Sequence, residues 1–274
     1  MESPALLLSA VPMVLGSNED EGPSFIAACP ACSEMLPAGM TIQQLRVWLG
    51  DFFGGPQWAE KILAAYPGAE LAPNTTAARM LGDYMMQCTA RRAAMKLSAS
   101  VAGTMVFLYN FAEPNPNSVN DYCDQAVLHG CEVPFVFAAP SAVGTPATSA
   151  VAEGMVRRWR SFARAGAPSD KKANAAWPHA AEGSYMHFRA DSTHGQGFGA
   201  LSTAALGDEQ RFAPCAVWDE YALWASGRPE ASTGTRAPRR SALTPVVAGG
   251  AASLLGLSIM AFLAWRFCRR RRGR

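Results

Sequence analysis

Acidic residues are missing from the last part of the sequence. Residues 236–274 contain nine arginines and no Asp or Glu, whereas the 235 residues before them carry 15 Lys and Arg against 22 Asp and Glu, a net charge of −7. A body this acidic offers no basic patch, so the composition argues against a nucleic-acid-binding surface. The sequence also lacks internal repeats.

Charge of either sign is absent from residues 241–265. This run is longer than the roughly 20 residues that cross a bilayer core, and a buried core helix would be shorter and would show a polar face. We therefore predict a single transmembrane helix at 242–265, preceded by a solvated stalk at 226–241. By the positive-inside rule the six arginines of 266–274 place this tail in the cytoplasm, and the body, residues 1–225, is then extracellular or lumenal.

The basic segment that opens a secretory signal is missing as well. Glu2 stands at its place, and proline interrupts the apolar run MESPALLLSAVPMVLG twice. Insertion by the C-terminal helix alone would leave the cysteines in the reducing cytosol and carry six arginines across the membrane. This conflict predicts that the natural N-terminus lies upstream of Met1.

Six of the seven cysteines lie in the body, and an even number in an exported domain suggests disulfide bonds. They are Cys29, Cys32, Cys88, Cys123, Cys131 and Cys215. Spacing alone leaves their pairing open, although Cys123 and Cys131 bracket a histidine and could close a small loop around it. The CPAC stretch lies in a loop after a strand, which disfavours a thioredoxin-type redox role. Asn74 begins an N-glycosylation acceptor, Asn-Thr-Thr, which fits a lumenal body.

Histidine is scarce, with four residues in 274. His179, His187 and His194 lie in loops or a polar strand without the spacing of metal ligands, so no metal site is predicted. His129 stands apart, in the apolar stretch LHGCEVPFVF with Glu132 close behind it. An isolated histidine in such a stretch is more often a structural residue than a general base.

Apolar runs and helical periodicity predict the fold class. Leu6–Leu15 and Thr104–Phe111 read as buried strands, the first breaking at Gly16 into the acidic turn NEDEG. A helix begins after Thr41, which with Gln44 forms a capping box. The apolar face of this helix comprises Ile42, Leu45, Leu49 and Phe52. A second helix is predicted at Asp83–Leu97. A third helix ends at Gly166, and its apolar face comprises Val151, Met155, Trp159 and Phe162.

Strands separated by long helices indicate an α/β protein with a mostly parallel sheet and helices on both of its faces. Two strands are too few to bury both faces against helices of this number. We therefore expect further strands from an upstream part of the protein.

Six segments occur in a fixed order: VPMVLGSNEDEGPSF, DYMMQCTARRAA, VFLYNF, LHGCEVPFVF, MVRRWRSFARAGAPS and CAVWDEY. In this order they resemble the C-terminal part of the carboxylesterase type B family, the α/β hydrolases that include the cholinesterases. The resemblance runs across nearly all of residues 5–222. It implies the C-terminal part of an α/β-hydrolase fold, hydrolysis of a small-molecule carboxylic ester and no cofactor.

The resemblance also assigns roles to single residues. It implies that Glu21 is the acid and His129 the base of a catalytic triad, and that Cys88 pairs with Cys215 in a disulfide. In such a triad the imidazole takes the proton of a serine hydroxyl, while the carboxylate fixes the tautomer of the imidazole. Glu19 and Asp20 share the acidic turn, and only the resemblance selects Glu21 from the three. Glu132 could orient the site or form a structural ion pair.

The nucleophile is missing. No G-x-S-x-G occurs in the 274 residues, and no HGGG-type oxyanion segment is present. The chain therefore has two members of a triad, and we expect that it does not hydrolyse esters by itself.

The sequence leaves two functions open, and a third if Met1 is the true N-terminus of the protein. One is a membrane-anchored serine esterase of which this sequence is a fragment. The other is a non-catalytic cell-surface adhesion protein of the same family, as the neuroligins are, which would bind a protein partner. A serine in an upstream G-x-S-x-G favours the enzyme, and Gly or Ala there favours adhesion, although the intact Glu21 and His129 favour the enzyme. A genuine Met1 would indicate a non-catalytic remnant.

Overall fold

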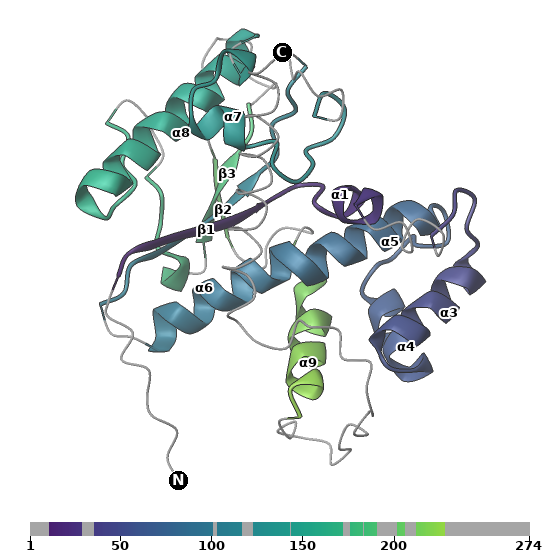
Figure 1. The fold of residues 1–274 in the computed structure, drawn as a ribbon. Helices are drawn as coiled ribbons and strands as arrows, with labels where there is room; N and C mark the ends of the chain where they lie inside the picture. The colour runs from purple at the N-terminus through teal and green to yellow at the C-terminus, as the bar shows by residue number, and fades with distance from the viewer. Residues whose placement is uncertain are drawn as a thin grey trace, which may run out of the picture. The chain divides into compact units, whose positions relative to one another are not determined.

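The computed structural model (Figure 1) describes most of the chain before residue 228. The described residues are 11–28, 36–100, 103–116, 123–142, 144–171, 176–182, 184–190, 202–205 and 212–227. The chain divides into two compact units, 1–220 and 221–274. The strands in the described part of the chain and the site described below belong to the first unit.

The described strands form one sheet in the order β1-β2-β3-β4. Their bounds are β1 Met13–Asn18, β2 Val106–Phe111, β3 Ser184–Phe188 and β4 Ser202–Ala205. β1, β2 and β3 run parallel, and β4 is antiparallel to β3. The prediction of a mostly parallel sheet is confirmed. The count of two strands is too low, because β3 and β4 follow β2 in this chain. The polar residues of β3 interrupt the apolar run by which a strand is recognised. Strands from an upstream part of the protein stay a prediction.

The helices lie on both faces of the sheet, as predicted. Their bounds are α1 Gly22–Ala27, α3 Ile42–Phe53, α4 Pro56–Ala64, α5 Pro73–Gly82, the π-helical turn η1 Asp83–Gln87, α6 Cys88–Ser100, α7 Val133–Val136, the 3-10 turn η2 Pro140–Ala142, α8 Pro146–Ala165, the 3-10 turn η3 Ala180–Glu182 and α9 Cys215–Ala225. α6 runs along one face of β1 and β2, and α8 covers the other face (Figure 1). There the ring of Trp159 lies 5.4 Å from that of Tyr109.

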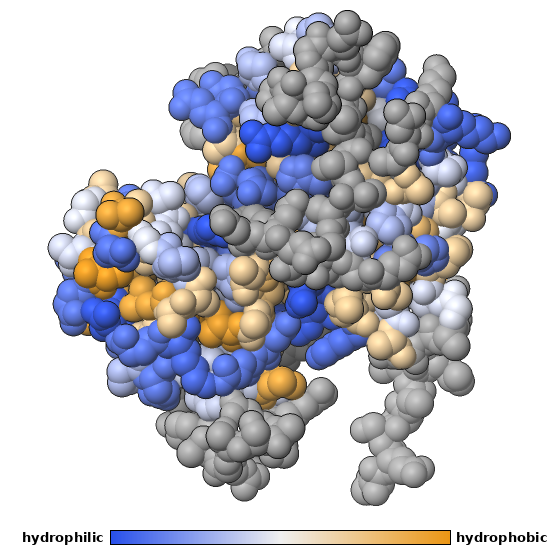
Figure 2. Space-filling model, turned by 180° about the vertical axis from the view of Figure 1, so that it is seen from behind, coloured by the Kyte–Doolittle hydropathy of each residue, from blue (hydrophilic) through white to orange (hydrophobic). Residues whose placement is uncertain are grey.

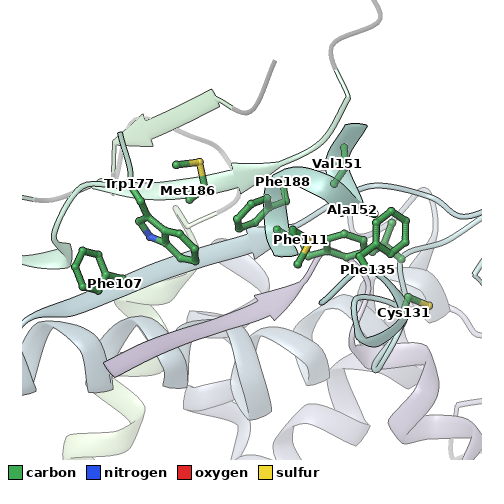
Figure 3. Close-up of a cluster of buried hydrophobic side chains, with 11 residues drawn as sticks. Phe107, Phe111, Cys131, Phe135, Val151, Ala152, Trp177, Met186 and Phe188 are labelled. Carbon is green, nitrogen blue, oxygen red and sulfur yellow. The ribbon is translucent and has the colours of Figure 1, made fainter. Parts of the chain in front are cut away.

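The face under α8 holds an aromatic core (Figure 3). It comprises Phe107, Phe111, Val127, Cys131, Phe135, Val151, Ala152, Met155, Trp177, Met186 and Phe188. Trp177 donates its indole hydrogen to the carbonyl oxygen of Leu108 at 2.9 Å, so its one polar group is satisfied inside the core. Because Cys131 and Phe135 belong to this core, the loop between β2 and α7 is anchored against the sheet on the side that follows His129.

Two local predictions need correction. β1 does not end at Gly16 but continues to Asn18, because a side chain at Gly16 would lie 2.2 Å from the ring of Tyr109 and the glycine gives that ring room inside the sheet. The cap of α3 is as predicted, but Phe52 is 46% exposed and Phe53 is buried in its place. Phe53 reaches the ring of Trp218 at 5.0 Å, a contact that helical periodicity does not reveal.

The outer face of α3 leaves apolar surface in the open. Val47 and Phe52 are exposed beside the largely buried Trp48, and Figure 2 shows hydrophobic patches on the side of the molecule formed by α3 and α4. Within the described residues no helix combines the length and the apolar character needed to cross a membrane. The predicted transmembrane helix, stalk and tail lie outside the described residues except for 226 and 227.

Candidate active site

The two predicted site residues meet although 108 positions separate them in the sequence. Glu21 immediately precedes α1, just beyond the end of β1, and His129 lies in the loop after β2. The Nδ1 atom of His129 lies 2.6 Å from Oε2 of Glu21. Because β1 and β2 are parallel neighbours, the segments after their carboxyl ends emerge at the same edge of the sheet.

A glycine directly follows each of the two site residues, Glu21 and His129, and allows the local path of the backbone. A side chain at Gly22 would lie 1.7 Å from the carbonyl oxygen of Ala78, so only glycine lets the turn after Glu21 pack against α5. Gly130 follows His129 with φ +86°, in the left-handed region that other residues rarely adopt. The chain therefore turns sharply directly after the imidazole.

The acidic residues of the turn make different contacts. Glu21 is the one whose carboxylate reaches the imidazole in the part of the chain that the structure describes. The carboxylate of Asp20 instead accepts a hydrogen bond from the backbone N–H of Val127 at 3.0 Å, and its own N–H donates to the Val127 carbonyl. The role of Glu21 as the acid of a triad stays a prediction.

Asn18 is a site residue that the sequence reasoning missed. Its backbone N–H donates to Oε1 of Glu21 at 2.7 Å, so both oxygens of this carboxylate are occupied. Its side-chain nitrogen donates to the carbonyl oxygen of Leu128 at 2.7 Å and to Oε2 of Glu132 at 2.5 Å. A possible signal was its place in the acid motif at the end of a buried strand, where a polar side chain needs partners.

The carboxylate of Glu132 accepts hydrogen bonds from the side-chain amide of Asn18 and from its own backbone N–H. Both donors are neutral, which favours the orienting role over a structural ion pair. Burial raises the pKa of Glu132, the hydrogen bond from Asn18 opposes this rise, and the negative charge of Glu21 adds to it. Two carboxylates therefore flank His129 from different elements.

The pKa of His129 is raised above its ordinary value. The main cause is the hydrogen bond to Glu21; burial works against it, and the negative charges of Glu21 and Glu132 support it. With the Nδ1 hydrogen directed at Glu21, the Nε2 atom of the neutral ring is an acceptor. The ring packs against Phe25 at 5.2 Å, and the backbone N–H of His129 donates to the hydroxyl of Ser24 at 3.3 Å.

Two disulfides are present in the described residues. Cys88 and Cys215, the pair that the resemblance implies, join α6 to α9. Cys123 and Cys131 pair across eight positions and enclose His129 between them. Cys29 and Cys32 lie outside the described residues, as does Cys268.

The remaining predicted positions stand apart from the Glu21–His129 pair. Asn74 lies partly buried in the first turn of α5, and its glycosylation stays a prediction. His179 packs against Phe107 with 4.8 Å between the ring centres, and His187 lies on β3; His194 lies outside the described residues. No group of three or more His, Cys, Asp or Glu side chains in the described part of the chain is arranged to hold a metal ion.

Parallel strands with a glutamate–histidine pair at their carboxyl edge are the arrangement in which α/β hydrolases present the acid and the base of their triad. A family model described as "Carboxylesterase family" matches residues 2–205, which is most of the 274-residue chain. The chain belongs to the carboxylesterase family. Membership of this esterase-like family indicates a small-molecule ester as the kind of substrate.

Proposed function

We propose that this chain supplies the acid and the base of a membrane-anchored carboxylic ester hydrolase that acts through a serine acyl-enzyme. The observation that carries the proposal is the 2.6 Å contact between His129 Nδ1 and Glu21 Oε2. Glu21 is 3% exposed and fixed at its other oxygen by Asn18. This is the arrangement in which a carboxylate orients an imidazole and stabilises the imidazolium.

Each group has a definite task. Nε2 of His129 takes the proton of a serine hydroxyl as the oxygen attacks the ester carbonyl, and Glu21 stabilises the imidazolium that results. The imidazolium then gives the proton to the leaving alcohol. In the second half of the cycle His129 takes a proton from water, which attacks the acyl-enzyme and releases the acid.

The serine must come from outside the 274 residues. No G-x-S-x-G occurs in them, and α/β hydrolases use the chain order serine, acid, histidine. We therefore propose that the nucleophile lies on a preceding part of a longer protein.

The first experiment maps the 5′ end of the transcript, expresses the complete product in cells and labels it with a fluorophosphonate probe. We expect labelling of the complete protein and none of residues 1–274 alone. Replacing the acid, Glu21→Gln, should slow hydrolysis of p-nitrophenyl acetate on the order of 10⁴-fold, because the wrong tautomer of His129 is then favoured. His179→Gln is the matched control, since His179 packs against Phe107 away from the pair and its loss should leave the rate unchanged. A complete protein that carries Gly or Ala in place of the serine and does not react would instead favour the adhesion function.

The membrane topology is tested separately. Protease added to intact vesicles should cut the tail at 266–274 only from the cytoplasmic side, and an endoglycosidase should shift the wild-type band but not that of Asn74→Gln. Digestion of the body from the cytoplasmic side would overturn the proposed orientation.

A further inference from the structure

We propose that Asn18 is the positioning residue of the Glu21–His129 pair: its main chain holds the acid and its side chain holds the loop of the base. The inference deepens the proposed esterase function and rests on it. Asn18 would not touch substrate, because it is 1% exposed and acts through the two residues that it holds.

The contacts of Asn18 reach both sides of the pair. The backbone N–H fixes Oε1 of Glu21 at 2.7 Å, which leaves Oε2 for the imidazole. The two hydrogens of the side-chain amide go to Leu128, directly before His129, and to Glu132, three positions after it. One residue therefore spans the acid turn and the base loop.

The orientation of the amide follows from its neighbours. Both contacting atoms, a carbonyl oxygen and a carboxylate oxygen, are acceptors, so the atom that faces them must be the nitrogen. A carboxylate at this position has no hydrogen to donate and would repel both oxygens. Aspartate, although it has the same shape, cannot replace Asn18.

The place of Asn18 in the fold makes this contact rigid. It is the last residue of β1 and stands in register with Phe111, the last residue of β2. The sheet is covered on both faces, so a residue at the end of β1 moves little. Groups held by such an element keep their geometry better than groups held by a loop alone.

Asn18 also controls the charge next to His129. Its hydrogen bond opposes the rise in the pKa of Glu132, so its removal favours the protonated, neutral form of that carboxyl. His129 then loses part of a negative charge that supports its own protonation. A looser contact with Glu21 acts in the same direction. Both effects predict that the pKa of His129 falls when the amide is removed.

The experiment titrates the full chain in detergent micelles, with ¹³C-labelled histidine and NMR detection of the imidazole Cε1–H signals. The chain has four histidines, and comparison with His129→Gln assigns the signal that matters. We expect a downward shift of the His129 titration in Asn18→Ala, and a smaller one in Asn18→Ser, which retains a single donor. The matched control is Asn110→Ala, which removes a fully buried asparagine side chain on β2 whose polar atoms have no partner within the described residues.

The outcomes separate a positioning role from a structural one. If Asn18→Ala lowers the melting temperature while the His129 titration stays in place, the proposal is overturned. If Asn18→Ala does not fold, Asn18→Ser decides by the same readout. The titration needs no nucleophile, so a shifted His129 in a protein whose complete form fails to react with fluorophosphonate would leave the positioning role standing and refute the esterase function.

Discussion

The two disulfides should affect different properties of the protein. Loss of the Cys88–Cys215 bridge should cost more stability, whereas loss of the Cys123–Cys131 bridge should disturb the site more. The perturbations are the double variants Cys88→Ala with Cys215→Ala, and Cys123→Ala with Cys131→Ala. The first bridge closes a separation of 127 residues and the second a separation of 8. The loop-entropy model gives about 5 kcal/mol for the long loop and about 2.5 kcal/mol for the short one at 25 °C.

The titration of His129 should depend more on the short bridge than on the long one. The short bridge encloses His129, and Cys131 is anchored in the aromatic core, so its loss frees the base loop on the side that follows the histidine. The long bridge joins α6 to α9 and does not border the pair. We therefore expect the short-bridge variant to shift the titration of His129 and the long-bridge variant to leave it unchanged.

Urea unfolding in detergent, followed by tryptophan fluorescence, measures the stability, and NMR titration measures the site. The wild-type chain under the same conditions is the reference. The reasoning is refuted if the short-bridge variant loses as much stability as the long-bridge variant, or if removal of the long bridge moves the His129 titration.

Two further predictions concern buried charge. Because the folded protein raises the pKa of His129, the contribution of its pair with Glu21 is present below the unfolded value of 6.5 and is lost as the pH rises through the folded value. Glu21→Gln should therefore cost about 1.5–3 kcal/mol at pH 6 and less at pH 9, measured by urea unfolding at both pH values; an equal cost at both would contradict the assignment. Asp170→Asn should cost about 3–5 kcal/mol, since it leaves the fully buried Arg158 without its carboxylate. The control is Glu60, whose ion pair with Arg46 is exposed, and Glu60→Gln should cost less than about 1 kcal/mol in the same assay. Similar losses of stability for Asp170→Asn and Glu60→Gln would show that burial of the ion pair does not cause the larger loss.

The sequence predicts the elements whose signals are local. The cap of α3 is set by Thr41 and Gln44, three positions apart, and the end of α8 by Gly166 in the left-handed conformation, so both follow from neighbouring residues. The mostly parallel sheet follows from strands separated by helices. β3 could not be found, because Ser184 and His187 break its apolar pattern while its other residues are buried against partners far away in the sequence.

Some of the site residues could likewise be predicted from the sequence and others could not. The motif order predicts Glu21 and His129, and the structure brings them together. Asn18 could not be found from the sequence, because its role depends on Leu128 and Glu132, more than a hundred positions away. A polar residue at the end of a strand has many possible partners, and only the register of the sheet selects among them.

The separation of the acid and the base along the chain affects the order of folding. The short bridge forms within eight residues, whereas the contact of Glu21 with His129 must close 108 residues, including α3, α4 and α6. Closing the longer loop costs more chain entropy and needs the pairing of β1 with β2 first. The disulfide of the base loop can therefore form before Glu21 makes its contact with His129. The elevated titration of His129 would then appear late, and in a time-resolved refolding experiment it would report completion of the sheet.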